Sequence, residues 1–546
     1  MASGKAAGYF ALCVAANSAA LWLLAVPFAD IWFSTDEGLY AYQAQRILDG
    51  QVIYRDFFQA IMPGYFFMLA GWMKVAGMGV ASLRAFMILL MLATSIAIYL
   101  ASRRLGVPTL LSIVPALTFS VLRSRYNFEL NHYAPNLLFE TATLSLVCSQ
   151  ALRPARWKLA LAGTLVSADV LTTQHVGAHL LIGTIFSVVF LSVVTRQNAW
   201  REMLSFIEGA LPLPIAYLGY AVHTGSLAAM FRCTVLWVFS HYTRFDTQDY
   251  WYYWVRLTWR LFTENPGAGT AHDFALGVVE SFAAPAAVLI SAVWLLRLWR
   301  VSGTLDDSQR AFGAAALIAA SMYACIYAAP NSIISRVSLT GYLLAYALVH
   351  RVYSQWRRPC PRLGLRGGLV PGGVAALLLL AVPLRTARVF GNILLQHSTM
   401  QTTTYRTAHG PIRLPVESDT GQLDVLSFLA RNATPAEFVY AANWSPWVYY
   451  LGGYRNPGTT EYLLPYFTTD ATVRETVRIL DSTRTRWLVQ DSIVRRGLEH
   501  NDGRLQSLSE LLMQQWQFNR YRDSSYTVAV VFGDYTIYRR KETAPE

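Results

Sequence analysis

The apolar run YFALCVAANSAALWLLAVPF (residues 9–28) is followed closely by DEGLYAYQAQRILDG (residues 36–50), and this junction indicates the fold. The first run has the length that a helix needs to cross a bilayer, roughly 20 residues. The second begins with the adjacent acids Asp36 and Glu37, and its apolar positions recur at helical spacing. We therefore expect a membrane span that leads directly into an amphipathic helix on the membrane surface, capped by Asp36.

A second surface helix is expected to follow the first. Gly50 ends the first helix, and Pro63 suits the first turn of a new helix after an extended stretch. The residues Ile61–Val75 are apolar enough to span the membrane, but that span would move Arg103 and Arg104 to the outer side. We therefore predict that this helix lies in the interface. Two interfacial helices explain the periodicity of the loop, but they give no reason for its acidic pair.

The composition of the whole chain is that of a membrane protein. It has 546 residues, of which 54% are hydrophobic and only 14% are charged, whereas soluble domains carry roughly 25% charged residues. This argues against a soluble enzyme, a disordered chain or a nucleic-acid-binding protein, despite the net charge of +12. The five cysteines show no short paired spacing, so neither a disulfide framework nor a zinc site is indicated.

Eleven apolar stretches are predicted to be transmembrane helices, although several of them are short. They are Tyr9–Phe28, Ser82–Leu100, Pro108–Leu122, His132–Ala151, Leu159–Thr172, Val176–Val194, Ser205–Val222, Phe274–Leu296, Ala311–Ala329, Val337–His350 and Gly368–Leu384. If the N-terminus is cytoplasmic, the loops rich in arginine and lysine all fall on the inner side. This positive-inside asymmetry accounts for much of the basic excess, and eleven spans then leave the C-terminus outside.

The last third of the chain has a different composition. Of the 33 acidic residues, 16 fall between Glu417 and Glu546 and 17 fall before Arg385. Strands are predicted at Phe438–Ala441, Arg486–Gln490, Thr527–Phe532 and Tyr535–Arg539, and helices at Gly421–Arg431, Ala471–Asp481 and Leu505–Trp516. We therefore predict a polytopic α-helical membrane domain, residues 1–385, followed by an outer α/β domain, residues 386–546.

Polar residues gather in the outer loops of the predicted membrane domain. The second outer loop carries Arg125, Glu129, Asn131 and His132 in a short stretch, and we expect it to border a site. A lone histidine at the end of a span is more often an interfacial anchor than a catalyst. The long outer segment, residues 223–273, contains Arg244 and the run YWYYW at residues 250–254. That run favours the headgroup layer, and contact with a sugar or a carrier lipid is the alternative.

The first hundred residues resemble the polytopic GT-C glycosyltransferases, a family that includes the protein O-mannosyltransferases and the bacterial aminoarabinose transferases. The layout of the spans agrees loosely with that family, and the C-terminal domain agrees only in being an outer α/β module. The matching residues are Asp36-Glu37, Tyr40, Ala44, Gly50, Tyr54, Asp56, Pro63, Gly77, Arg84 and Arg103-Arg104.

The resemblance implies an enzyme that moves a sugar from a polyprenyl-phosphate-linked donor to a lipid, glycan or protein acceptor, with inversion at the anomeric carbon. The reaction would take place at the periplasmic face of a bacterial inner membrane. By that likeness Asp36 is the expected general base, Glu37 orders the site, and Glu129 is the nearest match to an acid that relatives carry in the second loop. Relatives have a Thr-Lys pair facing the carrier phosphate, so Gln174 and His175 are expected as its substitutes here.

The leaving phosphate gains charge in the transition state, and guanidinium groups suit its oxygens. The arginines expected near it are Arg55, Arg84, Arg125, Arg244 and Arg336. The other substrate-binding candidates are Tyr40, Tyr54, Asp56, Asn131 and His132. Acidic side chains also bind Mg²⁺ or Mn²⁺ through oxygen, and Asp36 and Glu129 would be the ligands. Because related transferases include metal-independent ones, metal use stays open.

Three other kinds of membrane protein are alternatives to a transferase. A transporter or lipid flippase would also be polytopic and basic inside, but such proteins often show paired halves, and no internal symmetry is found here. Polar residues collect in outer loops and not at mid-span, with Asp169 and Glu280 as exceptions. A sensor would need only one or two spans. An oligosaccharide polymerase or ligase seldom ends in a large outer α/β domain, by the same family analogy.

Overall fold

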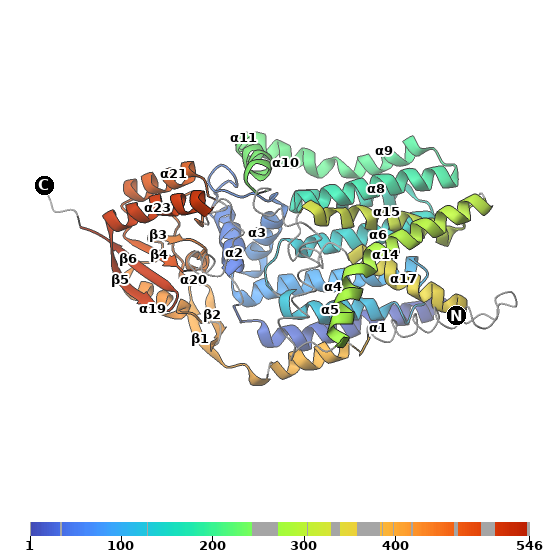
Figure 1. Cartoon of the computed structure of the whole chain (residues 1–546), viewed down its shortest axis with the longest axis horizontal. Helices are drawn as coiled ribbons and strands as arrows, with labels where there is room; N and C mark the ends of the chain where they lie inside the picture. Colours follow the sequence, from blue (N-terminus) through green and yellow to red (C-terminus); the bar gives the residue numbers. More distant parts are fainter. Residues whose placement is uncertain are drawn as a thin grey trace.

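The computed structural model describes residues 2–32, 35–127, 129–242, 271–302, 304–328, 339–356, 383–384, 386–396, 398–416, 419–463, 468–492 and 508–542. These residues form an elongated molecule, with a bundle of long helices at one end and a smaller α/β domain at the other (Figure 1). Two short helices, α2 (Thr35–Leu48) and α3 (Gly64–Ala76), lie between the bundle and the α/β domain. The first outer loop is therefore helical, as its periodicity predicts.

The bundle contains most of the long helices of the described chain. They are α1 (Ala2–Ala25), α4 (Val80–Arg104), α5 (Ile113–Asn127), α6 (Tyr133–Leu152), α7 (Arg156–Thr172), α8 (Gln174–Thr195), α9 (Ala199–Ala210), α10 (Pro212–His223), α14 (Ala271–Ser302), α15 (Asp307–Ala328) and α17 (Leu339–Trp356). Shorter turns are η1 (Val26–Phe28), α11 (Leu227–Phe231), η2 (Arg232–Leu236) and η3 (Val238–Tyr242).

Among the described residues, four helical segments are long and apolar enough to cross a membrane, by length and composition: Lys5–Phe28, Val80–Arg104, Gln174–Thr195 and Ala199–His223. Large apolar side chains are exposed along the bundle, among them Trp22 and Phe186, where a bilayer would cover them. The first ten predicted spans overlap described helices, but α5 begins five residues after Pro108, and Ser205–Val222 is divided between α9 and α10 where Pro212 begins a new helix. The eleventh lies outside the described residues apart from its last two, so the count of eleven stays a prediction.

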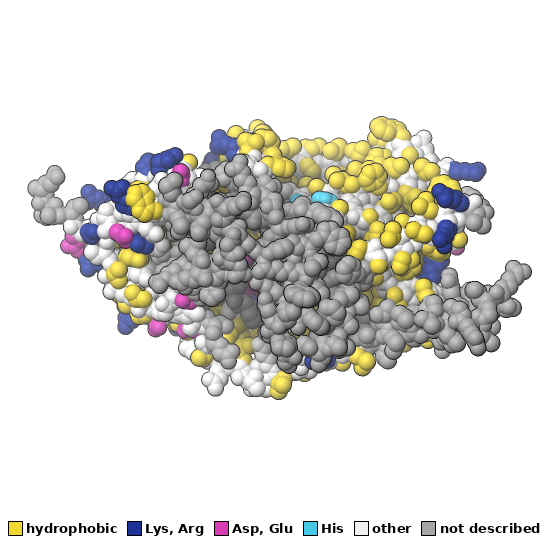
Figure 2. Space-filling model, viewed as in Figure 1, with side chains coloured by type: hydrophobic (Ala, Val, Ile, Leu, Met, Phe, Trp, Pro, Cys, Tyr) yellow, Lys and Arg dark blue, Asp and Glu magenta, His cyan; other side chains and the backbone are white. Residues whose placement is uncertain are grey.

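Basic side chains gather at the end of the bundle that carries the N-terminus (Figure 2). The N-terminus lies at the end farthest from the α/β domain (Figure 1). Figure 2 shows lysine and arginine side chains gathered at that same end, next to a largely apolar face. Arg196, just after α8, and Arg201, in the first turn of α9, are among the exposed basic residues of the bundle. This is the distribution that the positive-inside rule predicts for a chain whose N-terminus faces the cytoplasm.

Glycine lets two bundle helices approach closely. A methyl group built on Gly209 of α9 would lie 1.7 Å from the carbonyl oxygen of Ala160 in α7. One built on Gly163 of α7 would lie 2.1 Å from the carbonyl oxygen of Phe206. Small residues at such contacts are typical of helix pairs in membranes, because they let the two backbones approach closely.

The α/β domain is built on a four-stranded sheet in the order β3-β4-β6-β5. Its strands are β3 (Val439–Ala442), β4 (Trp487–Asp491), β5 (Tyr526–Phe532) and β6 (Tyr535–Arg540). Strands β3 and β4 are parallel, and the other pairs are antiparallel. The helices are α19 (Gln422–Asn432), α20 (Trp447–Gly452), α21 (Asp470–Ser482) and α23 (Leu508–Ser525). All four predicted strands are confirmed within about one residue.

A second, two-stranded sheet joins the bundle to this domain, and the sequence did not predict it. It is the hairpin of β1 (Thr402–Thr407) and β2 (Gly410–Pro415). Residues 386–396, just before it, are helical, and Ile393 packs in the bundle core. The boundary predicted at 385–386 therefore falls ahead of a helix that contacts the bundle.

Candidate functional site

Asp36 lies where the bundle meets the α/β domain. It occupies the first turn of α2 together with Glu37, and acidic groups at this end of a helix are favoured by the helix dipole. Its side chain is partly buried. The indole Nε1 of Trp444, in the α/β domain, donates a hydrogen bond to Asp36 Oδ1 at 2.9 Å. The first predicted catalytic residue is therefore in direct contact with the last third of the chain.

Glu37 faces the interior and forms a buried ion pair with Arg84 of α4. Arg84 Nη2 donates to Glu37 Oε2 at 2.8 Å, and Nη1 contacts the other carboxylate oxygen. Arg84 Nη2 also donates to the carbonyl oxygen of Ile31 at 2.6 Å, and the amide of Leu130 donates to Glu37 Oε1 at 3.0 Å. Glu37 therefore ties α2 to the start of α4 and to the second outer loop. Both side chains are almost completely buried.

Tyr40 and His132 form a hydrogen-bonded pair beside Asp36. The Tyr40 hydroxyl lies 2.9 Å from His132 Nδ1, and both side chains are buried. Burial raises the pKa of Tyr40 well above its usual value, and the nearby charges of Asp36 and Glu129 add to that shift. Tyr40 is one turn further along α2 from Asp36, so both side chains lie on the same side of the helix. The phenol is therefore neutral at physiological pH.

The second outer loop folds over this part of α2, as its density of polar residues predicts. Burial raises the pKa of both Tyr40 and Tyr65, and the negative charge of Glu129 adds a smaller contribution to each shift. Asn131 Oδ1 accepts a hydrogen bond from the amide of Tyr133 at 2.9 Å and so holds the start of α6. The described structure thus brings Asp36, Tyr40, Glu129 and His132 together from two separate loops.

Three other predicted residues form a turn at some distance from this group. Tyr54 has a positive φ of 70°, and its hydroxyl donates to the carbonyl oxygen of Ile61 at 2.7 Å. Arg55 pairs with Asp56 at 2.8 Å, and Asp56 Oδ2 accepts from the amide of Val52 at 2.7 Å. These bonds lower the pKa of Asp56, the Arg55 contact most strongly. Their contacts stabilise the turn, and only the Arg55 guanidinium is substantially exposed.

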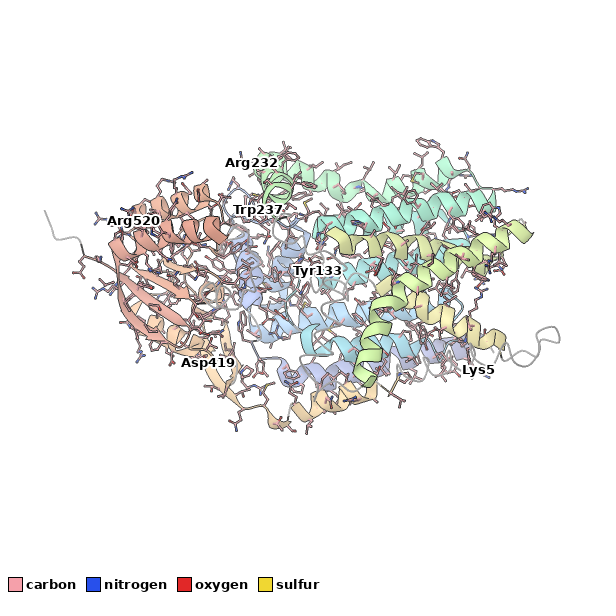
Figure 3. The ribbon with its side chains drawn as sticks, viewed as in Figure 1. Lys5, Tyr133, Arg232, Trp237, Asp419 and Arg520 are labelled. Atoms are coloured by element: carbon pink, nitrogen blue, oxygen red, sulfur yellow. The ribbon has the colours of Figure 1, made fainter. Side chains whose placement is uncertain are left out.

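Gln174 and His175 lie at the start of α8, below the first outer loop. Gln174 Nε2 donates to the carbonyl oxygen of Ala60 at 2.8 Å, and Gln174 Oε1 accepts from the amide of Met62 at 3.2 Å. Gln174 therefore fixes the entry into α3. The ring of His175 lies 6.1 Å from that of Tyr133, which Figure 3 labels in the interior of the molecule. Within the described part of the chain, His175 Nε2 is buried and has no hydrogen-bond partner.

Some predicted site residues cannot be placed. Arg244, Arg336 and the aromatic run at residues 250–254 lie outside the described residues, as does the side chain of Arg125. The last described part of the long outer segment carries Trp237, which Figure 3 labels near the junction of the bundle and the α/β domain. Its ring packs edge-on against Phe58 of the first outer loop, with centroids 5.1 Å apart.

The contact between α2 and the α/β domain is the part of this region that the sequence did not predict. Arg46 forms a buried ion pair with Glu461, and Gln43 Nε2 donates to Glu461 Oε2 at 3.0 Å. Burial raises the pKa of Glu461, and the Arg46 charge opposes that rise. Gln43 and Arg46 follow Leu39 at positions i+4 and i+7, so they lie on the same stripe of the helix. Polar side chains on the same stripe as Leu39 could have indicated a polar contact of α2. The sequence did not indicate that Glu461 would be their partner.

Only two residues, Asp36 and Glu129, are predicted as metal ligands. Among the described residues, no group of three or more His, Cys, Asp or Glu side chains is placed to hold a metal ion. Asp36 and Glu129 alone would supply two carboxylates, which suits Mg²⁺ only when a substrate phosphate and water complete its shell. No step of the chemistry below depends on a metal ion.

Comparison with known proteins identifies the fold. No family model matches the chain, and no curated protein matches it significantly. Among solved structures, it resembles ArnT from Cupriavidus metallidurans in the apo state, with 14% identity over 98% of both chains and a TM-score of 0.50. The chain has an ArnT-like fold. A crystal structure of the same ArnT bound to undecaprenyl phosphate gives 15% identity over 99% of both chains and a TM-score of 0.49. The ArnT-like fold agrees with the GT-C resemblance of the first hundred residues.

Proposed function

We propose that the chain is a GT-C-type glycosyltransferase that moves a sugar from a polyprenyl-phosphate-linked donor to a lipid, glycan or protein acceptor. The observation that supports this most is the position of Asp36, at the start of α2 between the bundle and the α/β domain, with Tyr40, Glu129 and His132 beside it. The reaction would take place at the outer, periplasmic face of a bacterial inner membrane, with the N-terminus in the cytoplasm.

Asp36 has the chemistry of a general base for this transfer. The acceptor hydroxyl oxygen forms a bond to the anomeric carbon while the bond from that carbon to the carrier phosphate oxygen breaks. The hydroxyl proton passes to the Asp36 carboxylate, and the carrier leaves as polyprenyl phosphate. Attack from the face opposite the phosphate inverts the anomeric centre. The neutral Tyr40 phenol and His132, which are hydrogen-bonded to each other, are proposed to form hydrogen bonds with the sugar.

Glu37 and Arg84 fit a positioning role better than contact with substrate. Both are buried and bound to each other, and the Arg84 guanidinium also contacts the carbonyl oxygen of Ile31. The carrier phosphate is therefore assigned to one of the remaining arginines. Arg55 is the exposed candidate among the described side chains, at 48% exposure. The others are Arg125, Arg244 and Arg336.

The experiment that tests this function measures transfer of a radiolabelled sugar from polyprenyl phosphate in membranes that contain the chain. Asp36→Asn keeps the size of the side chain and removes its basicity, so we expect transfer to fall by more than about 100-fold. Asp49→Asn is the matched control, because Asp49 is exposed at the other end of α2. It should transfer within about twofold of the native rate. Native transfer by Asp36→Asn would contradict the proposal.

A transporter or flippase of a lipid-linked saccharide is the second candidate, and one observation favours it. Asp169 of α7 is fully buried in the bundle, and Asn136 Nδ2 donates to its Oδ1 at 2.5 Å. Among the described residues, Asp169 Oδ2 has no partner. Buried carboxylates in membrane helices commonly mark transport pathways. The side chain of Glu280, the other acid near a span, lies outside the described residues.

A comparison of Asp36→Asn with Asp169→Asn distinguishes the flippase from the transferase. A flippase would keep its activity in Asp36→Asn and lose it in Asp169→Asn, measured as movement of a fluorescent polyprenyl-linked sugar across vesicles. A transferase would lose sugar transfer in Asp36→Asn.

A further inference from the structure

We infer that Trp444 of the α/β domain is a positioning residue for the Asp36 carboxylate, so that the site is completed by the last third of the chain. This inference rests on the proposed function, since it assigns Trp444 a part in that same site. Its basis is the hydrogen bond from Trp444 Nε1 to Asp36 Oδ1 at 2.9 Å. The indole N–H can only donate, so Asp36 Oδ1 is the acceptor of this bond. The bond restrains the orientation of the Asp36 carboxylate.

Trp444 is held in place by the carboxyl ends of two parallel strands. It follows β3 closely, and its backbone amide donates to Asp491 Oδ2 at 2.8 Å, at the end of β4. The Ser445 hydroxyl donates to the same oxygen at 2.6 Å. Asn443, with a φ of 63°, donates from Nδ2 to the carbonyl oxygen of Asp491 at 2.6 Å. Loops at the carboxyl ends of parallel strands are where α/β folds place their functional groups.

The indole ring is also fixed by aromatic packing. The ring of Trp444 packs against that of Tyr462 with centroids 4.9 Å apart. Tyr462 is buried against Leu39, which lies three residues after Asp36 on α2. The ring therefore touches the same helix that carries the acid it binds. The Trp444 side chain is restrained by the hydrogen bond of its backbone amide to Asp491 and by the packing of its ring against Tyr462. It therefore loses little conformational freedom when it binds a carboxylate.

The α/β domain is anchored to α2 at three further places. Gly38, next to Glu37, lies so close to α20 that a methyl group on it would be 2.4 Å from the Cα of Trp447. The hydroxyl of Tyr42 accepts from the amide of Asn456 at 2.8 Å. The buried pair of Arg46 and Glu461 follows one turn later. The spacing between Trp444 and Asp36 is thus set by an extended interface.

Removal of the indole N–H tests this role. In Trp444→Phe we expect kcat to fall about 10- to 100-fold, the loss of one hydrogen bond to a charged group. The KM for the donor should stay within about twofold, because Trp444 acts on the base and not on the carrier. Trp516→Phe is the matched control, since Trp516 is exposed in the same domain. If Trp444→Phe fails to fold, benzothienylalanine at position 444 replaces the N–H by sulfur with nearly the same shape, and the same fall in kcat is expected.

A measurement that does not need activity tests the hydrogen bond itself. In protein labelled with ¹⁵N-tryptophan, the indole signal of Trp444 should move when Asp36 is changed to Asn, while that of Trp516 stays. An unmoved Trp444 signal would overturn the inference. So would full kcat in the benzothienylalanine protein when Asp36→Asn is inactive, and the proposed function would then still stand. If the Trp444 signal moves in Asp36→Asn but the native protein transfers no sugar, the hydrogen bond is confirmed and the proposed function is refuted.

Discussion

At the scale of single residues, the two adjacent acids of the first outer loop have different surroundings. Asp36 is partly buried and contacts Trp444, whereas Glu37 is enclosed and bound by Arg84 and the amide of Leu130. One residue of separation turns the second side chain about 100° around the helix, so neighbours on one helix face different environments. The residues alone indicated only that the pair was unusual, and the different roles expected for Asp36 and Glu37 came from the family resemblance.

The buried pair should be essential to stability. Glu37→Gln leaves the Arg84 charge buried without its carboxylate, and loss of one partner of such a pair costs about 3–5 kcal/mol. We expect a marked fall in the melting temperature of the purified protein in detergent.

Glu475→Gln is the matched control for this change, because Glu475 pairs with Arg478 on an exposed helix surface. It should leave the melting temperature nearly unchanged, since exposed pairs contribute little. Equal shifts in the two variants would show that the Glu37 pair does not stabilise the fold.

At the scale of elements, α2 is the helix on which the site depends, and its contact with α20 requires a glycine. In Gly38→Ala the added methyl group meets the backbone of Trp447, so the two helices must separate. We expect a lower melting temperature and a loss of transfer, although alanine is the better helix former.

Gly71→Ala provides the comparison within α3, where no atom lies within 4 Å of the added methyl group. There the substitution should be neutral or stabilising by up to about 1 kcal/mol. If Gly38→Ala behaved in the same way in differential scanning fluorimetry, the close approach of α2 and α20 would be wrong.

The elements also show how far local pattern carries a prediction. Strands β3 to β6 were predicted correctly because alternation and β-branched residues are visible within each segment. The hairpin of β1 and β2 was not predicted, and the glycine and prolines of β2 are residues that strands disfavour. The convergence of Tyr40 with His132 was predictable only as nearness of two outer loops, since the bond joins residues 92 positions apart.

At the scale of the whole molecule, the first outer loop and the α/β domain share one apolar core. Buried residues from α2 and α3 pack with residues from the domain, among them Tyr42 against Tyr449 with ring centroids 4.9 Å apart. The sequence predicted this domain only as an outer α/β module that follows the membrane domain. The 408 positions between Asp36 and Trp444 explain why their contact could not be predicted, because no periodicity links residues that far apart.

The orientation of the molecule gives a prediction of its own. Arg196 lies at the basic end of the bundle and Arg539 lies on the α/β domain, and both are accessible. In intact bacteria whose outer membrane has been permeabilised, a maleimide that cannot cross the inner membrane should label Arg539→Cys and spare Arg196→Cys. The measurement is the maleimide labelling of each variant in excess of the labelling of the native protein, which has five cysteines. The reverse pattern would place the α/β domain in the cytoplasm and remove the proposed periplasmic reaction.

The shared core of α2 and the α/β domain has a consequence for how the protein is made. Synthesis delivers Asp36 to the membrane near the start of translation and Trp444 near its end. The two groups meet only after the intervening helices have inserted and the final segment has been exported and folded. If the proposed function holds, an unfinished polypeptide lacks the Trp444 contact to Asp36, and a nonsense mutation before the final sheet should lower sugar transfer at least as much as Trp444→Phe does.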